Sequence, residues 1–233
     1  MPASIYICLL TFDRLDYAIK TLRSTLDNIV YDGNLSVHIA DDGSSEEYRQ
    51  TLIDIAGGYK NVQGVTVTNS ERGGYGRSYN LAMQTVHLYA DIILPLEDDW
   101  ELCRPLDLHP LVEALQTGEF GCIRLGYIGF TQPLRGELTH VAAHTYLRFD
   151  HDSPEPHVWA GHPRLETREW QRSVGPWPEG LDPGSTEFSV AHRPEARKGV
   201  AWPLDLIHPV GDLFLHFGAW QARTDQREVA EVV

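Results

Sequence analysis

Three consecutive carboxylates, Glu97, Asp98 and Asp99, directly follow an apolar run at residues 91–96. Adjacent anions repel one another, and a hard divalent cation that prefers oxygen ligands makes such a cluster favourable. Mg²⁺ and Mn²⁺ have this preference, and they leave coordination positions open for substrate phosphates. The triplet therefore predicts a metal site that holds a pyrophosphate, and a solvated turn or a helix cap is the alternative.

A second acidic segment, residues 41–44, reads Asp-Asp-Gly-Ser. The Asp42 carboxylate can accept a hydrogen bond from a nucleobase N–H, and Gly43 lets the backbone turn away sharply. The same letters are typical of a plain turn in which a serine caps the following helix. A nucleoside contact is therefore predicted only in combination with the other motifs.

A glycine-rich loop, residues 72–77, precedes a predicted helix and carries Gly74 between Arg72 and Arg77. Glycines before a helix N-terminus let the backbone approach an anion, and either arginine can add charge-assisted bonds to phosphate. A dinucleotide-binding fingerprint belongs after the first strand of its unit, so this late position disfavours a Rossmann dehydrogenase.

These residues need elements that bring them together, and the first hundred residues alternate apolar runs with helical spacing. Strands are predicted at 4–11, 35–40, 62–68 and 91–96, and helices at 15–29, 44–55 and 76–90, the first of them capped by Asp13. The pattern indicates a parallel α/β sheet, in which ligands bind at the carboxyl ends of the strands. The apolar run at 91–96 predicts a central strand covered on both faces.

The second half of the chain is richer in Pro, Gly, Trp and His and alternates less regularly. Strands are predicted at 120–128 and 138–149, and helices at 164–172 and 186–192. The sequence contains no internal repeat and no low-complexity linker. We therefore expect one domain over 1–233, with a smaller, loop-rich second half.

The formal net charge of −14 over 233 residues disfavours binding of duplex nucleic acid, which needs clustered Lys and Arg. We find neither a long apolar span nor a basic amphipathic helix in the sequence. The first residues lack the basic region of a secretory signal and lead directly to the first predicted strand. These features predict a cytoplasmic protein with no membrane span. Cys8, Cys103 and Cys122 are odd in number and widely spaced, which predicts buried thiols.

Four segments in register, residues 10–14, 41–44, 69–80 and 97–99, resemble the nucleotide-sugar half of a family 2 glycosyltransferase. The resemblance implies a GT-A fold, an α/β Rossmann-like and mostly parallel sheet flanked by helices. It also implies a nucleotide-sugar-binding half over 1–100 and an acceptor-binding, catalytic half over 101–233.

The resemblance implies a role for each residue of these motifs. Asp99 is the implied metal ligand, and Glu97 and Asp98 are placed nearer the ribose and the sugar. The other residues expected to bind the nucleotide sugar are Thr11, Phe12, Arg14, Asp42, Gly74 and Arg77. The family often has Ala-Arg-Asn where residues 78–80 read Ser-Tyr-Asn, so the donor role of that arginine has no match here.

A later segment, residues 175–187, resembles the acceptor side of the same family, where a glycine-rich loop leads into an acid at the start of a helix. By this match Glu187 is the first choice for the general base that takes the proton of the attacking hydroxyl, and Asp182 is the second. An N-terminal helix cap is the alternative for this segment. Trp177 is expected to stack on a sugar.

A late histidine completes the metal shell in some relatives, and His216 is expected to do so here, with His208 as the alternate. A neutral imidazole is a competent metal ligand. The alternative is a core histidine that is hydrogen-bonded among the neighbouring aromatic residues.

The resemblance implies a metal-dependent, inverting transfer of a hexose or N-acetylhexosamine from a UDP-type sugar to an acceptor hydroxyl. A glycan, a protein, a small molecule and a modified nucleobase all fit as the acceptor, and the negative net charge makes DNA the least favoured. A sugar-nucleotide pyrophosphorylase would share the sheet and the metal, but residues 11–14 lack its long Gly-rich, Lys-containing loop. An inactive relative that binds sugar or acts as a scaffold is the other alternative, and the presence of all the acids weakens it.

Overall fold

The computed structural model describes residues 2–126, 135–154, 157–207 and 213–218, so His208 and residues 127–128 of one expected strand lie outside it. The strands are β1 Ser4–Thr11, β2 Ile29–Val30, β3 Asn34–Asp41, β4 Val62–Asn69, β5 Ile92–Glu97, β6 Trp100–Leu102, β7 Leu106–Asp107, β8 Cys122–Arg124, β9 Gly136–Val141, β10 His144–Phe149, β11 Arg164–Thr167, β12 Val200–Pro203 and β13 Phe214–His216. The helices are α1 Leu15–Asn28, α2 Glu46–Gly57, α3 Tyr75–Val86, α4 His109–Gln116, α5 Arg168–Val174, α6 Pro183–Ala191, the 3₁₀ turn Glu195–Arg197 and α7 Leu204–Ile207.

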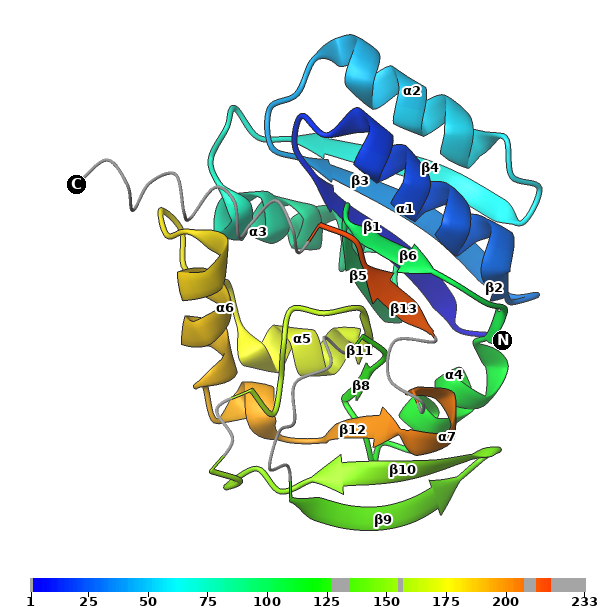
Figure 1. Ribbon diagram of the computed structural model, residues 1–233, viewed down its shortest axis with the longest axis vertical. Helices are drawn as coiled ribbons and strands as arrows, with labels where there is room; N and C mark the ends of the chain where they lie inside the picture. Colours follow the sequence, from blue (N-terminus) through cyan, green and yellow to red (C-terminus); the bar gives the residue numbers. More distant parts are fainter. Residues whose placement is uncertain (1, 127–134, 155–156, 208–212, 219–233) are drawn as a thin grey trace.

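A nine-stranded mixed sheet runs in the order β4-β3-β1-β5-β11-β8-β12-β10-β9. The first four of these strands are parallel, and Thr11 is level with Asp41 while Leu10 is level with Glu97. Figure 1 shows α1 and α2 on one face of these strands and α3 on the other. This arrangement aligns the carboxyl ends of β1, β3 and β5 at one edge, which is where the predicted acids are attached.

The expected α/β architecture is confirmed, including the central position of the fourth predicted strand. Residues 92–96 of β5 are buried, and β5 lies between β1 and β11. Covering on both faces explains why this strand is a continuous apolar run rather than an alternating one.

Some predicted boundaries are wrong for reasons that the tertiary contacts supply. Residues 164–167 form β11 because they pair with β5 and β8, so the predicted helix begins only at Arg168. The predicted strand at 138–149 is a hairpin of two strands, with Ala142 at a positive φ of 52° in the turn. Asp13 does not cap α1: its own φ is 47°, and Arg14 is the cap residue, without a side-chain bond.

The second half of the chain extends the same sheet through β11, which is antiparallel to β5. This segment carries an ion pair between Arg164 and Glu166, both of which are buried. Arg164 also donates to the carbonyl of Gly161 at 2.8 Å, and its guanidinium lies 4.8 Å from the Trp159 ring centroid. A buried charge is tolerated when it is paired and hydrogen-bonded, so these contacts fix β11 against the neighbouring loops.

The structure shows where the three cysteines lie and how long and apolar the helices are. Cys8 and Cys122 are buried as expected, but Cys103, directly after β6, is exposed, so the prediction of a buried thiol is wrong for this residue. Among the helices in the described part of the chain, none has both the length and the apolar character needed to cross a membrane.

The folded state should lose stability in acid through His38. This residue of β3 is fully buried, and its ring nitrogens lie 2.8 Å and 3.0 Å from the hydroxyls of Thr66 and Thr68 on β4. Burial lowers the pKa of His38 from 6.5 to about 4. The unfolded chain therefore binds a proton between these values that the folded chain does not, so the contribution is complete above pH 6.5 and is lost as the pH falls to 4.

The loss should be about 3 kcal/mol at most and should be visible in the free energy of unfolding by urea at pH 7.5 and 4.5. His38→Gln should flatten the pH dependence over this interval. His192→Gln, on an exposed histidine, is the control for removing one imidazole. The same slope in His38→Gln and wild type would contradict the assignment.

Candidate functional site

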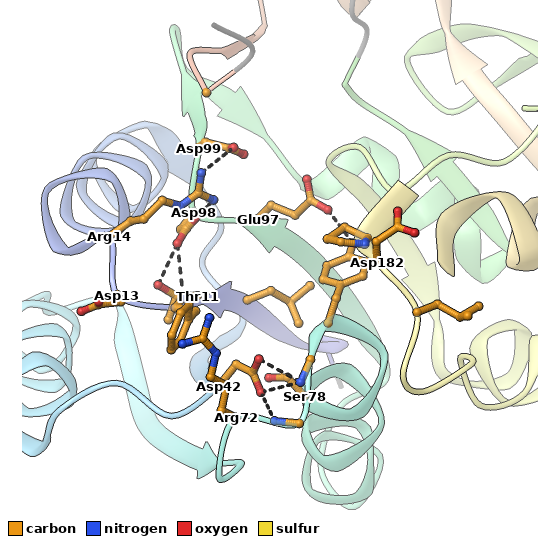
Figure 2. Close-up of a pocket in the computed structure, with 18 of the residues that line it drawn as sticks. Thr11, Asp13, Arg14, Asp42, Arg72, Ser78, Glu97, Asp98, Asp99 and Asp182 are labelled. Carbon is orange, nitrogen blue, oxygen red and sulfur yellow. Dashed lines mark hydrogen bonds and ion pairs between the residues drawn. The ribbon is translucent and has the colours of Figure 1, made fainter. Parts of the chain in front are cut away.

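The carboxyl ends of β1, β3 and β5 open into a cleft of about 1040 Å³, and Asp42 and Asp99 both face it (Figure 2). The glycine loop, residues 180–183, His216 and Gly218 complete its walls. The predicted site residues that line it are Thr11, Phe12, Arg14, Asp42, Gly74, Glu97, Asp98, Asp99, Asp182 and His216. Arg77 and Glu187 do not line it: Arg77 is exposed, and its stem packs on Gly73.

The acid triplet is positioned by the end of β5 and the turn into β6. Arg14 lies between Asp98 and Asp99 (Figure 2), and it pairs with the Asp98 carboxylate while its Nη1 is 3.3 Å from Asp99 Oδ2. Thr11 Oγ1 donates to Asp98 Oδ2 at 3.0 Å. Asp98 is only 1% exposed, so these contacts account for how a carboxylate is held beneath the cleft floor.

Burial and charge give the three acids different proton affinities. Burial raises the pKa of Glu97 to about 7, and the neighbouring charge of Asp99 adds to the shift. Burial also raises the pKa of Asp98 to about 6 although Arg14 opposes it. Burial acts on Asp99 too, but His216 and Arg14 outweigh it and lower the pKa of that carboxyl. Asp99 is therefore the acid of the triplet that keeps its negative charge most readily.

The surroundings of Asp99 fit a divalent cation. Its Oδ1 is buried without a hydrogen-bond partner and lies 3.4 Å from His216 Nε2. Burial opposes protonation of His216, but Asp99 and Glu97 raise its pKa above the usual value. The cleft lining contains six carboxylates against two arginines and one histidine, an excess of negative charge that would repel a diphosphate. Within the described residues, no group of three or more His, Cys, Asp or Glu side chains is arranged to hold a metal, so Asp99 and His216 would need substrate oxygens to complete the coordination.

Asp42 organises the glycine loop. Its Oδ1 accepts from the backbone N–H of Gly73 at 2.8 Å, and its Oδ2 accepts from that of Gly74 at 3.0 Å. The Ser70 hydroxyl donates to the same carboxylate. The sequence predicted a phosphate at the loop amides, and in this structure the amides of Gly73 and Gly74 donate to the side chain of Asp42. The carboxylate therefore fixes the wall of the cleft before any ligand contributes.

The sequence analysis left the choice between Arg72 and Arg77 open and did not predict a role for Tyr75. Arg72 rather than Arg77 lines the cleft, and its guanidinium carbon lies 4.5 Å from the Phe12 ring centroid. Tyr75 also lines it, and its hydroxyl donates to Glu97 Oε1 at 2.5 Å. A tyrosine directly after two glycines at a helix start was the available signal for the second contact.

The two candidate bases have different environments, because Asp182 is the N-cap residue of α6 and Glu187 lies within the helix. Asp182 is exposed at the cleft and caps the helix by accepting from the Ser185 backbone N–H at 3.0 Å. Hydrogen bonds from the Ser185 side chain and from this N–H lower its pKa. Glu187 is half-buried in the second turn, and its Oε1 accepts from the Gly161 N–H at 2.5 Å. The cap alternative therefore applies to Asp182, and the helix begins three residues earlier than predicted.

The expected sugar platform at Trp177 is wrong. This side chain is 3% exposed and stacks on Tyr79, with ring centroids 3.7 Å apart and an angle of 11°. Asn80 holds the same segment, because its Oδ1 accepts from the Trp177 N–H at 2.8 Å and its Nδ2 donates to the Trp177 carbonyl at 3.0 Å. The triplet 78–80 thus anchors residues 177–180 to α3. The position where the family often has arginine is Tyr79, which packs on Trp177 here.

A model of glycosyl transferase family 2 matches residues 6–161, which includes every strand that carries the acids. The chain belongs to glycosyl transferase family 2. This family member has the GT-A fold of the solved structures that resemble it.

One of these structures is S. aureus TarS, at a TM-score of 0.61 and 13% identity over 85% of this chain and 35% of that chain. TarS 1–349 in complex with UDP-GlcNAc is similar at 0.61 and 13%, with 85% of this chain and 55% of that chain covered. GalNAc-T7 with UDP, GalNAc and Mn²⁺ is similar at 0.62 and 15%, with 86% and 42% covered. The chain therefore spans about a third to just over half of the length of these relatives, and at such identities the likeness shows the fold. No curated protein sequence matches the chain.

Gly76 should be required for the cleft wall. It lies in the first turn of α3, where a Cβ would overlap the carbonyl of Pro178. Gly76→Ala should lower the free energy of unfolding by about 1–3 kcal/mol because the packed segment must move. Gly57→Ala, at the end of α2 with nothing within 4 Å of the added carbon, should stay within about 0.5 kcal/mol of wild type. Equal effects in urea unfolding of both variants would contradict the close-approach argument.

Proposed function

We propose that the chain transfers a hexose or N-acetylhexosamine from a UDP-type sugar to an acceptor hydroxyl, with metal assistance and inversion. The observation that carries the proposal is that Asp42, Asp98 and Asp99, which follow two different parallel strands, line one cleft. UDP-GlcNAc is bound in a TarS structure, and UDP with Mn²⁺ is bound in a GalNAc-T7 structure, which supports the choice of donor.

In this proposal the donor lies along the edge of the sheet from β3 to β5. Thr11, Phe12, Arg14 and Asp42, all of which line the cleft, surround the nucleoside. Gly74 and the arginines of its loop face the phosphates, and Arg72 is better placed than Arg77 because it lines the cleft. Glu97 and Asp98 lie nearer the ribose and the sugar.

A divalent cation, Mn²⁺ or Mg²⁺, would be held by Asp99 and His216. When bound it would neutralise the charge that develops on the departing diphosphate. The Oδ1 of Asp99, which accepts no hydrogen bond, and the excess of carboxylates in the cleft support this assignment.

Glu187 is our first choice for the base that accepts the proton of the attacking hydroxyl, and Asp182 is the second. The Gly161 N–H holds the Glu187 carboxylate in place, whereas Asp182 is already engaged as a helix cap. A glycan, a protein side chain or a small molecule could supply the hydroxyl, and the acceptor panel of a transfer assay separates these classes.

The donor and the metal together should stabilise the protein only when Asp99 is present. UDP-GlcNAc and Mn²⁺ at 100 times the dissociation constant should raise the unfolding free energy by about 2.7 kcal/mol, measured as a rise in Tm. Asp99→Ala should abolish the rise in Tm. Asp54→Asn, at an exposed position of α2, should retain the full rise. A full rise in Asp99→Ala would remove the metal assignment, and no rise in wild type with any UDP-sugar would remove the donor.

The two base candidates should separate in a transfer assay. Glu187→Gln should lower kcat by about 10²- to 10⁴-fold while the donor-induced rise in Tm persists. Asp182→Asn should leave both nearly unchanged, because asparagine is an equally good helix cap. The opposite pattern would move the base to Asp182.

A further inference from the structure

Tyr75 occupies a junction between the donor acids and α6. It is the first residue of α3, and its hydroxyl donates to Glu97 Oε1 at 2.5 Å, at the carboxyl end of β5. Burial, reinforced by the charge of Glu97, raises the pKa of Tyr75 well above its ordinary value of 10. The phenol therefore keeps its proton and acts as a hydrogen-bond donor.

The ring of Tyr75 is held from the acceptor side. Its centroid is 5.1 Å from that of Trp177, with an angle of 51° between the planes. Trp177 is itself fixed by Tyr79 and by an edge-to-face contact with Trp159 at 5.7 Å. Because all of these neighbours belong to a packed aromatic cluster, the Tyr75 ring has little freedom to move away from Glu97.

Tyr75 and Glu187 lie on the same side of Gly161. A Cβ placed on Gly161 would be 3.2 Å from Glu187 Oε1 and 3.5 Å from the Tyr75 hydroxyl oxygen. The Gly161 N–H in turn holds Glu187. The phenol is thus the polar group that lies between Glu97 on β5 and the neighbourhood of Glu187 on α6.

We propose that Tyr75 is a positioning residue that fixes the Glu97 carboxylate toward the donor sugar and couples this acid to the acceptor-side wall at 177–180. The inference rests on the proposed function, in which Glu97 lies near the sugar. Without the phenol hydroxyl, one carboxylate oxygen loses its donor and the side chain can rotate in response to repulsion from Asp99 and Glu187. A misplacement of about 1 Å near the reacting atoms can cost about 100-fold in rate.

Tyr75→Phe tests this with Tyr79→Phe as the matched control. Both changes remove one phenol oxygen from a tyrosine of α3 that packs on Trp177. Tyr75 is half-buried and Tyr79 is buried, and Tyr79 donates to Glu166 instead, at 3.1 Å. Tyr75→Phe should lower kcat for sugar transfer about 10- to 100-fold. Its dissociation constant for UDP with Mn²⁺ should stay within about two-fold, because UDP lacks the sugar that Glu97 is proposed to face. Tyr79→Phe should lower Tm while kcat stays within about two-fold of wild type.

Wild-type kcat in Tyr75→Phe, or an equal loss of kcat in Tyr79→Phe, would overturn the inference. Crystal structures of the wild type and Tyr75→Phe without substrate give a second readout, in which the Glu97 carboxylate should leave its wild-type position in the variant. An unmoved carboxylate would overturn the inference even if transfer were slow. Failure of the proposed function would instead be seen as absence of transfer by the wild type, and the crystal structures would still decide whether Tyr75 positions Glu97.

Discussion

Like charges concentrated at one edge of a parallel sheet are the constraint on which the rest of the structure depends. Parallel pairing brings the ends of β3 and β5 to the same edge, and both carry acids there. A carboxylate that loses water on burial is unfavourable unless it gains hydrogen bonds or an opposite charge. The residues around the cleft therefore provide partners for both carboxylate oxygens of Asp42 and Asp98 and for one oxygen of Glu97.

The distribution of these partners separates structural acids from the acid that is left for chemistry. Asp41 is bound by Ser44 and Arg49 and only supports the start of α2. Asp42 is bound by the glycine-loop amides, and Asp98 by Arg14. Asp99 retains a buried oxygen without a hydrogen bond, facing His216. The best candidate for holding a cation is thus identified by what its neighbours do not satisfy.

The second half of the chain completes the cleft by packing onto α3. Gly76 lets the Pro178 carbonyl approach closely, and the aromatic stack of Tyr79 with Trp177 holds the segment in place. Buried Arg164 and Glu166 connect this stack to β11 and hence to β5. A displacement of residues 177–180 would therefore be transmitted to the strand that carries the acid triplet.

The sequence by itself determined the parallel strands, their order along the chain and the placement of acids after β3 and β5, because hydrophobic periodicity is local and parallel topology aligns the strand ends. Only the tertiary structure decided which side chains meet there. Residues 164–167 became a strand because β5 was available to pair with them. Trp177 became a core residue, Arg72 replaced Arg77 in the cleft, and Tyr75 reached Glu97. These outcomes depend on side-chain directions and on contacts between residues far apart in the chain. The spacing of residues along one sequence does not predict such directions and contacts.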